Sequence, residues 1–139
     1  MIVWDGSQSA VSHSYRPIVM VVDDEAYIRD LETQVLKQAG FSVLPVGSPS
    51  SALKMIEANM PVDIVVADLN MPGMQGDEMA ARLRRVRPDL KILFVTAFAN
   101  DLFDAQGLLW SDEAYLDKPF TQDGLIEAVS LLLCGDVTH

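Results

Sequence analysis

Short apolar runs alternate with amphipathic segments from residue 16 onward, and this alternation predicts strands separated by helices. The apolar runs occupy residues 17–22, 41–46, 62–67, 90–95 and 113–117. Three of them are almost continuously apolar, as expected of strands that are buried on both faces. Strands that alternate with helices form a parallel sheet with helices on both of its faces. We therefore predict an α/β domain.

Helical periodicity fills the intervals between the apolar runs. The first interval has an apolar stripe formed by Ile28, Leu31, Val35 and Leu36. In the third interval the stripe consists of Met79, Ala80, Leu83 and Val86. Two other segments begin with a serine or a threonine, residues that helices favour as N-terminal caps. The remaining predicted helices lie in residues 47–58, 98–110 and 121–135, the second of these interrupted by Gly107.

Composition limits the classes of protein to which the chain can belong. Its 139 residues suit one domain, which we place at residues 16–134 between a polar tail (1–15) and a short C-terminal tail (135–139). The formal net charge of −10 opposes direct binding to nucleic acid or to an anionic membrane surface. Residues 81–87 contain four arginines, which we interpret as a solvated helix face.

No disulfide can form within the chain, because Cys134 is its single cysteine. The first fifteen residues lack the basic start and the apolar run of a signal peptide. No stretch reaches the roughly 18 apolar residues that indicate a membrane span. We therefore expect a cytoplasmic protein without membrane insertion.

Polar residues stand at the ends of four predicted strands. Asp23 and Asp24 follow the first strand, Asp68 the third, Thr96 the fourth and Lys118 the fifth. Ligands of open α/β sheets bind beyond the carboxyl ends of the strands, which is where these residues should gather. Each has an ordinary structural explanation when taken alone: Asp24 would cap a helix and Asp68 would form a turn. Their occurrence at the same end of neighbouring strands favours a site.

Three carboxylates in one place resist ionisation unless a cation neutralises them. Hard oxygen ligands favour Mg²⁺, with Mn²⁺ as an alternative. A site that holds a divalent cation and the ammonium group of Lys118 attracts a phosphoryl group. A carboxylate in such a site can attack phosphorus and form an aspartyl phosphate.

Four motifs of the chain resemble those of the receiver domains of two-component response regulators, including chemotaxis regulators. They are VVDDE (21–25), VVADLNMPGMQG (65–76), FVTAF (94–98) and YLDKPF (115–120). They occur in the order and at the spacing of that family, and the resemblance covers residues 17–133. It implies a flavodoxin-like, doubly wound, five-stranded parallel sheet of order 2-1-3-4-5 with five helices on its two faces.

The resemblance also implies roles for the residues of the site. Asp68 is the expected phosphoacceptor, and Lys118 is expected to pair with it. Asp24 and Asp68 would bind Mg²⁺ directly together with the backbone carbonyl of Asn70, whereas Asp23 would act mainly through water. The phosphoryl donor would be a phosphohistidine on a histidine kinase or a histidine phosphotransfer protein.

Further residues are expected to transmit the change. Thr96 would move toward the phosphoryl group and Tyr115 would rotate inward, and the bond before Pro119 is expected to be cis. The usual readout face comprises the helix in 98–110, the strand in 113–117 and the last helix, and it would contact a downstream protein. A homodimer through this face is an alternative. Leu108, Leu109 and Trp110 could lie on it, although core or loop packing is the favoured interpretation of these three.

Two residues are expected to tune the site. Asn70 and Phe98 flank the expected path of the water that hydrolyses an aspartyl phosphate. Bulky, apolar Phe98 would hinder this water and so lengthen the lifetime of the phosphoryl group.

Other functions fit the residues less well. A phosphohydrolase of the haloacid-dehalogenase type requires an aspartate at position 70, where the chain has asparagine. A nucleotide- or flavin-binding module requires a glycine-rich loop after the first strand. A scaffold that has lost phosphorylation would not need the complete set of site residues. We expect a single-domain regulator or phosphorelay intermediate, with a receiver excised from a hybrid histidine kinase or longer regulator as the alternative.

Overall fold

Five parallel strands form one sheet in the computed structural model, which describes residues 16–69, 71, 73–96, 113–117 and 121–134. The strand order is β2-β1-β3-β4-β5, as the family resemblance implies. Each strand begins within two residues and ends within one residue of the apolar run that predicts it. The strands are β1 (Ile18–Val22), β2 (Ser42–Val46), β3 (Ile64–Asp68), β4 (Lys91–Thr96) and β5 (Glu113–Asp117).

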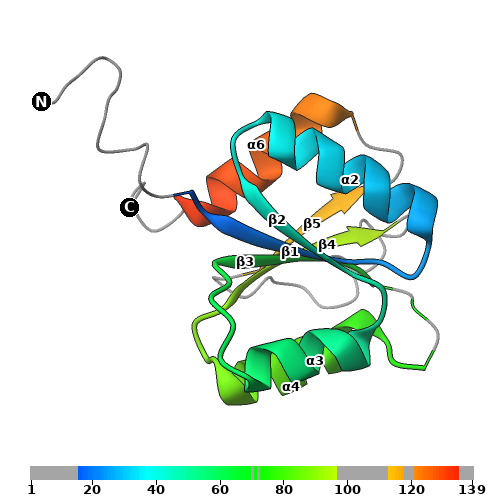
Figure 1. Ribbon diagram of the computed structural model, residues 1–139, viewed down its shortest axis with the longest axis vertical. Helices are drawn as coiled ribbons and strands as arrows, with labels where there is room; N and C mark the ends of the chain where they lie inside the picture. The colour runs from blue at the N-terminus through cyan, green and yellow to red at the C-terminus, as the bar shows by residue number, and fades with distance from the viewer. Residues whose placement is uncertain (1–15, 70, 72, 97–112, 118–120, 135–139) are drawn as a thin grey trace, which may run out of the picture.

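Helices cover both faces of this sheet in a three-layer, flavodoxin-like arrangement (Figure 1). Helices α2 and α6 lie on one face, and α3 and α4 lie on the other. The helix predicted in residues 98–110 lies outside the described residues. The described helices are α2 (Ala26–Gln38), α3 (Pro49–Glu57), α4 (Gly76–Val86) and α6 (Gln122–Leu133).

Side-chain caps begin two of the helices at the predicted residues. The Ser51 amide donates to Ser48 Oγ over 3.2 Å at the start of α3, where Pro49 is the first helical residue. The Gly124 amide donates to Thr121 Oγ1 over 2.9 Å at the start of α6. Each cap satisfies an amide that has no partner within its own helix. The sequence thus determines both helix starts locally.

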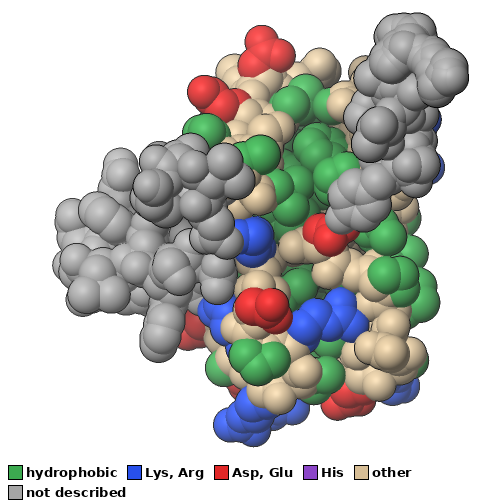
Figure 2. All heavy atoms as spheres, turned by 90° about the vertical axis from the view of Figure 1, so that its left-hand side faces the viewer, with side chains coloured by type: hydrophobic (Ala, Val, Ile, Leu, Met, Phe, Trp, Pro, Cys, Tyr) green, Lys and Arg blue, Asp and Glu red, His purple; other side chains and the backbone are tan. Residues whose placement is uncertain are grey.

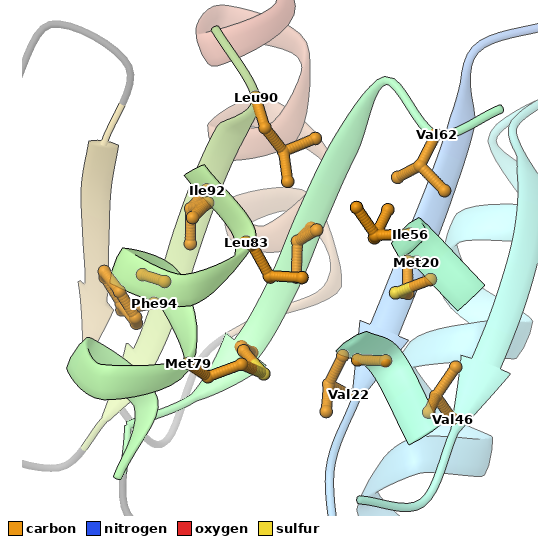
Figure 3. Close-up of a cluster of buried hydrophobic side chains, with 14 of the residues drawn as sticks. Met20, Val22, Val46, Ile56, Val62, Met79, Leu83, Leu90, Ile92 and Phe94 are labelled. Atoms are coloured by element: carbon orange, nitrogen blue, oxygen red, sulfur yellow. The ribbon is translucent and has the colours of Figure 1, made fainter. Parts of the chain in front are cut away.

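The core has one layer on each side of the sheet. Figure 3 shows the layer between the sheet and helices α3 and α4, in which side chains of β1, β3 and β4 meet Ile56, Met79 and Leu83. The second layer joins Val35 and Leu36 of α2, and apolar residues of α6, to the other face of the strands. Alternate residues of each strand point to opposite faces, so these strands contribute to both layers.

The apolar stripe predicted for α2 is partly wrong. Val35 and Leu36 are buried as expected, but Leu31 is 37% exposed whereas Glu32 is only 1% exposed. The cause is helical geometry: Glu32 precedes Val35 by three residues and Leu36 by four, so it lies on the same face as both. Leu31 lies at the edge of that face. Polarity alone did not reveal that this helix buries an acid.

The stripe of α4 also ends earlier than predicted, because its last residue, Val86, is 46% exposed. The basic segment is only partly a solvated face. Arg82 is exposed and pairs with Glu78 over 2.8 Å, whereas Arg87 donates to the carbonyls of Met60 and Val62 over 2.7 and 3.4 Å. Figure 2 shows basic side chains mainly over the lower part of its face, where α3 and α4 lie.

Candidate functional site

Two buried aspartates lie at the carboxyl edge of the sheet. Figure 1 shows this edge on its right-hand side, where the strand arrows end. Strands β1 and β3 are neighbours, with Val22 opposite Ala67. The next residue on each strand is therefore an aspartate: Asp23 follows β1 and Asp68 ends β3. Their exposures are 1% and 8%. The sheet register brings together two carboxylates that are 45 residues apart in the chain.

A third carboxylate completes an acidic cluster at this edge. Asp23, Glu25 and Asp68 each offer one oxygen, and these oxygens all lie within 4.8 Å of one another. Three hard oxygen donors at this separation suit a divalent cation such as Mg²⁺. Two of the three carboxylates are shielded from water. Their negative charges therefore repel each other more strongly than they would in water, and a bound cation lowers this repulsion energy by more. The residues present therefore fit the metal that the sequence predicts.

Asp24 differs from its predicted position in this cluster. Its side chain is exposed, and among the described residues it is Glu25, not Asp24, that joins Asp23 and Asp68. Asp24 does not cap α2 either, because the residue before that helix is Glu25 and no side chain accepts a capping hydrogen bond there. Glu25 is thus a site residue that the sequence analysis missed. Direct metal binding by Asp24 stays a prediction.

Hydrogen bonds hold the loop that carries the first two acids. The Asp23 amide donates to the Val46 carbonyl over 3.1 Å, which ties the loop to the end of β2. The Glu25 amide donates to Asp23 Oδ1 over 2.9 Å. The Asp23 carbonyl accepts a hydrogen bond from Arg29 Nη1 over 2.7 Å. The backbone of Asp23 is therefore held by β2 and α2, and its carboxylate accepts a hydrogen bond within the loop from Glu25.

The loop after Asp68 packs closely against the start of α4. The Gly76 amide donates to the Leu69 carbonyl over 2.6 Å. A Cβ atom on Gly76 would lie 2.8 Å from Leu69 Cα and 2.9 Å from the Asp68 carbonyl oxygen. Only glycine leaves room for this approach, a requirement that the sequence analysis did not identify.

The other predicted site residues are described only in part or not at all. Thr96 ends β4 at the same edge of the sheet, and Tyr115 lies in β5 opposite Phe94. The side chains of Thr96 and Tyr115 are outside the described part of the structure. So are the whole of Lys118, Pro119, Asn70, Phe98 and residues 108–110. The roles predicted for all of these residues stay predictions.

Comparison with known proteins establishes the family. Residues 19–130 match the family described as response regulator receiver domain, and this match spans most of the chain. The chain therefore belongs to the receiver domains of response regulators, which are signalling phosphoacceptors and not enzymes in the usual sense. Its acidic cluster lies where the phosphorylation site of such a domain is expected.

Relatives of the chain differ in length. It is 35% identical to the transcriptional regulatory protein YrkP of Bacillus subtilis over 107 residues, which make up 77% of the chain and 45% of that relative. It is 32% identical to the sensor kinase CckA of Brucella abortus, covering 91% of the chain but 13% of the kinase. The receiver protein CpdR of the same organism is 29% identical, with coverages of 83% and 95%. The chain thus spans less than half of the first two.

Solved structures support the same assignment. A response regulator receiver protein from Sinorhizobium medicae superposes with a TM-score of 0.76 at 30% identity, covering 86% of this chain and 96% of that one. The response regulator TrrA from Thermotoga maritima, solved in complex with Mg²⁺ and BeF, gives 0.73 at 33% identity, with coverages of 84% and 98%. Within the described part of the chain, no helix is both long and apolar enough to span a membrane.

Proposed function

We propose that Asp68 accepts a phosphoryl group from a phosphohistidine in the presence of Mg²⁺. The observation that carries this proposal is the convergence of Asp68 with Asp23 and Glu25 at the carboxyl edge of the sheet. A carboxylate oxygen of Asp68 attacks phosphorus, the bond between phosphorus and the histidine nitrogen breaks, and an acyl phosphate forms. The same chemistry lets the domain take a phosphoryl group from a small phosphodonor without its kinase.

Charge explains why the reaction needs a divalent cation. The incoming phosphoryl group is anionic, and the cluster that receives it contains three carboxylates. Mg²⁺ would neutralise this charge while bound directly by Asp68 and by the backbone carbonyl of Asn70, and mainly through water by Asp23. The third carboxylate is Asp24 in the family resemblance and Glu25 in the geometry of the cluster. The neighbouring relative TrrA, crystallised with Mg²⁺ and BeF, supports the choice of metal.

The remaining predicted roles complete the proposal. Lys118 pairs with Asp68 and then with a phosphoryl oxygen, while Thr96 and Tyr115 change position and so shift the readout face. A downstream protein recognises that face, with a homodimer as the alternative occupant. The likeness to CpdR, which the chain nearly spans, supports a single-domain regulator or phosphorelay intermediate. The likeness to a short part of CckA supports the alternative of a receiver within a hybrid kinase.

A small phosphodonor tests the central claim. We expect purified protein to take up phosphate from acetyl phosphate with Mg²⁺, as measured by mass spectrometry or by retarded migration on a phosphate-binding gel. Asp68→Asn should abolish uptake without unfolding the protein, because the exchange is nearly isosteric. No uptake by the unmodified protein would contradict the proposal and favour a scaffold. Titrating Mg²⁺ into Asp24→Asn and Glu25→Gln would show which carboxylate completes the metal site.

The lifetime of the phosphoryl group provides a separate test of Phe98. An acid at this position would give the attacking water a hydrogen-bonding partner in place of an apolar barrier. We expect Phe98→Glu to dephosphorylate about tenfold faster than the unmodified protein, which is less than the roughly 10²- to 10⁴-fold that a fully positioned general base contributes. Phe98→Leu keeps the position apolar and is the matched control. An unchanged or slower rate in Phe98→Glu would remove this role.

A further inference from the structure

Arg29 connects helix α2 to the backbone of the acidic loop. It lies in the first turn of the helix and is half-buried, and its Nη1 donates to the Asp23 carbonyl over 2.7 Å. The amide of the same residue, Asp23, donates to the Val46 carbonyl over 3.1 Å. Both polar groups of the Asp23 backbone are thus engaged, one by β2 and the other by α2. A hydrogen bond from a charged donor is among the stronger ones in proteins.

Gly47 gives the guanidinium group of Arg29 its space. A Cβ atom on Gly47 would lie 3.3 Å from Arg29 Nη1 and 3.8 Å from Arg29 Cζ. The guanidinium therefore lies directly over this glycine, which follows β2. Arg29 joins three segments that are separate in sequence: the start of α2, the loop after β1 and the residue after β2. All three segments lie at the edge of the sheet that carries the acidic cluster.

We propose that Arg29 is a positioning residue for the phosphorylation site. It fixes the Asp23 backbone and, through it, the Asp23 carboxylate that accepts the Glu25 amide over 2.9 Å. Two of the three acids of the cluster then depend on one guanidinium group. This inference rests on the proposed function, because it concerns the binding of Mg²⁺ at that site. Groups that orient metal ligands commonly change metal affinity by about 10- to 100-fold.

Positioning and simple charge effects predict opposite results when Arg29 is removed. Loss of a positive charge beside an acidic cluster would by itself strengthen Mg²⁺ binding. Loss of a positioning contact would weaken it. We expect Arg29→Met to raise the Mg²⁺ dissociation constant about tenfold, measured by isothermal titration calorimetry. The matched control is Arg82→Met, which makes the same charge change at the exposed Arg82–Glu78 pair on α4 and should leave Mg²⁺ affinity unchanged.

Gly47→Ala tests the same contact from the other side and keeps every charge. Its methyl group forces Arg29 to shift by a few tenths of an ångström, so we expect about a two- to threefold weaker Mg²⁺ affinity. In the Arg29→Met background the same exchange should have no effect, because the methyl group then meets no guanidinium. Such non-additivity is typical of residues that share one contact. Additive effects of the two substitutions would contradict the inference.

Amide hydrogen exchange measures positioning without any metal. With Arg29→Met, the Glu25 amide, which donates to Asp23 Oδ1, should exchange about five- to tenfold faster. Amides in the middle of β3 should be unaffected. An unchanged or stronger Mg²⁺ affinity, together with unchanged exchange at Glu25, would overturn the proposal for Arg29. If the unmodified protein bound neither Mg²⁺ nor phosphate, the proposed function would fail, and exchange at Glu25 would still decide whether Arg29 positions the loop.

Discussion

Gly76→Ala should lower both the stability of the fold and the rate at which Asp68 is phosphorylated. In a helix, alanine normally stabilises the helical conformation by up to about 1 kcal/mol relative to glycine. At Gly76 the new methyl group would instead meet backbone atoms, at 2.8 Å from Leu69 Cα and 2.9 Å from the Asp68 carbonyl oxygen. Ordinary contacts between such atoms begin near about 3.5 Å, so the loop after β3 and the start of α4 must separate by about 0.7 Å.

The size of the effect follows from these two opposing terms. Overpacking of this kind costs about 1–3 kcal/mol, which exceeds the gain in helix propensity. We therefore expect the free energy of unfolding to fall by about 1–2 kcal/mol, which corresponds to a lower Tm by roughly 5 °C for a domain of this size. Urea denaturation followed by circular dichroism measures the first quantity directly. Phosphate uptake from acetyl phosphate should slow at least about tenfold, because the Asp68 backbone must move.

Gly124→Ala is the matched control for this experiment. It makes the same exchange in the first turn of another helix, but its methyl group would meet a side-chain atom, Thr121 Oγ1, at 3.0 Å. That hydroxyl can rotate, so its lost cap and the gain in helix propensity should nearly cancel. The variant should stay within about 0.5 kcal/mol of the unmodified protein and phosphorylate normally. A Gly76→Ala variant as stable and as active as Gly124→Ala would refute the close packing at Asp68.

Two substitutions test other hydrogen bonds, and removal of the metal tests the site. Asp63 Oδ2 accepts a hydrogen bond from the Ile18 amide over 2.7 Å, so Asp63→Ala should lower the free energy of unfolding by about 2 kcal/mol in urea denaturation, whereas Asp89→Ala, at an exposed turn, should not. Thr121→Ala removes the cap of α6 and should cost about 1 kcal/mol in the same assay, with Thr121→Ser restoring most of it. Removal of divalent cations with EDTA should stop phosphate uptake and Mg²⁺ should restore it. Uptake that continued in EDTA would show that the carboxylate cluster works without a metal.

The sequence was a reliable guide wherever a local rule decides the structure. Buried strands of a parallel sheet leave nearly continuous apolar runs, and all five strands are found within two residues of those runs. Capping requires only a hydroxyl and a nearby amide, so Ser48 and Thr121 could be identified from their neighbours in the chain. The gathering of Asp23 and Asp68 at one edge followed from the parallel sheet, because both residues stand at the carboxyl ends of strands.

Contacts between distant segments limited what the sequence could indicate. Glu32 was not expected in the core, because the pattern ranks residues by polarity, although Glu32 lies on the same face of α2 as Val35 and Leu36. Glu25 was not expected in the acidic cluster, because the side-chain directions in a short loop depend on hydrogen bonds to Val46 and Arg29. Position 76 requires glycine because the backbone of Leu69 packs against it, and this contact forms only in the folded chain.

The sequence by itself thus determined the class of fold, the edge of the sheet that carries the chemistry and two of the acids at that edge. Only the tertiary structure decided which third carboxylate joins Asp23 and Asp68, and which arginine and glycines hold them in place. The physical reason is the distance along the sequence over which each effect acts. Periodicity, capping and strand ends act over a few residues, whereas the direction of a carboxylate is fixed by hydrogen bonds and close packing between segments that meet only after folding.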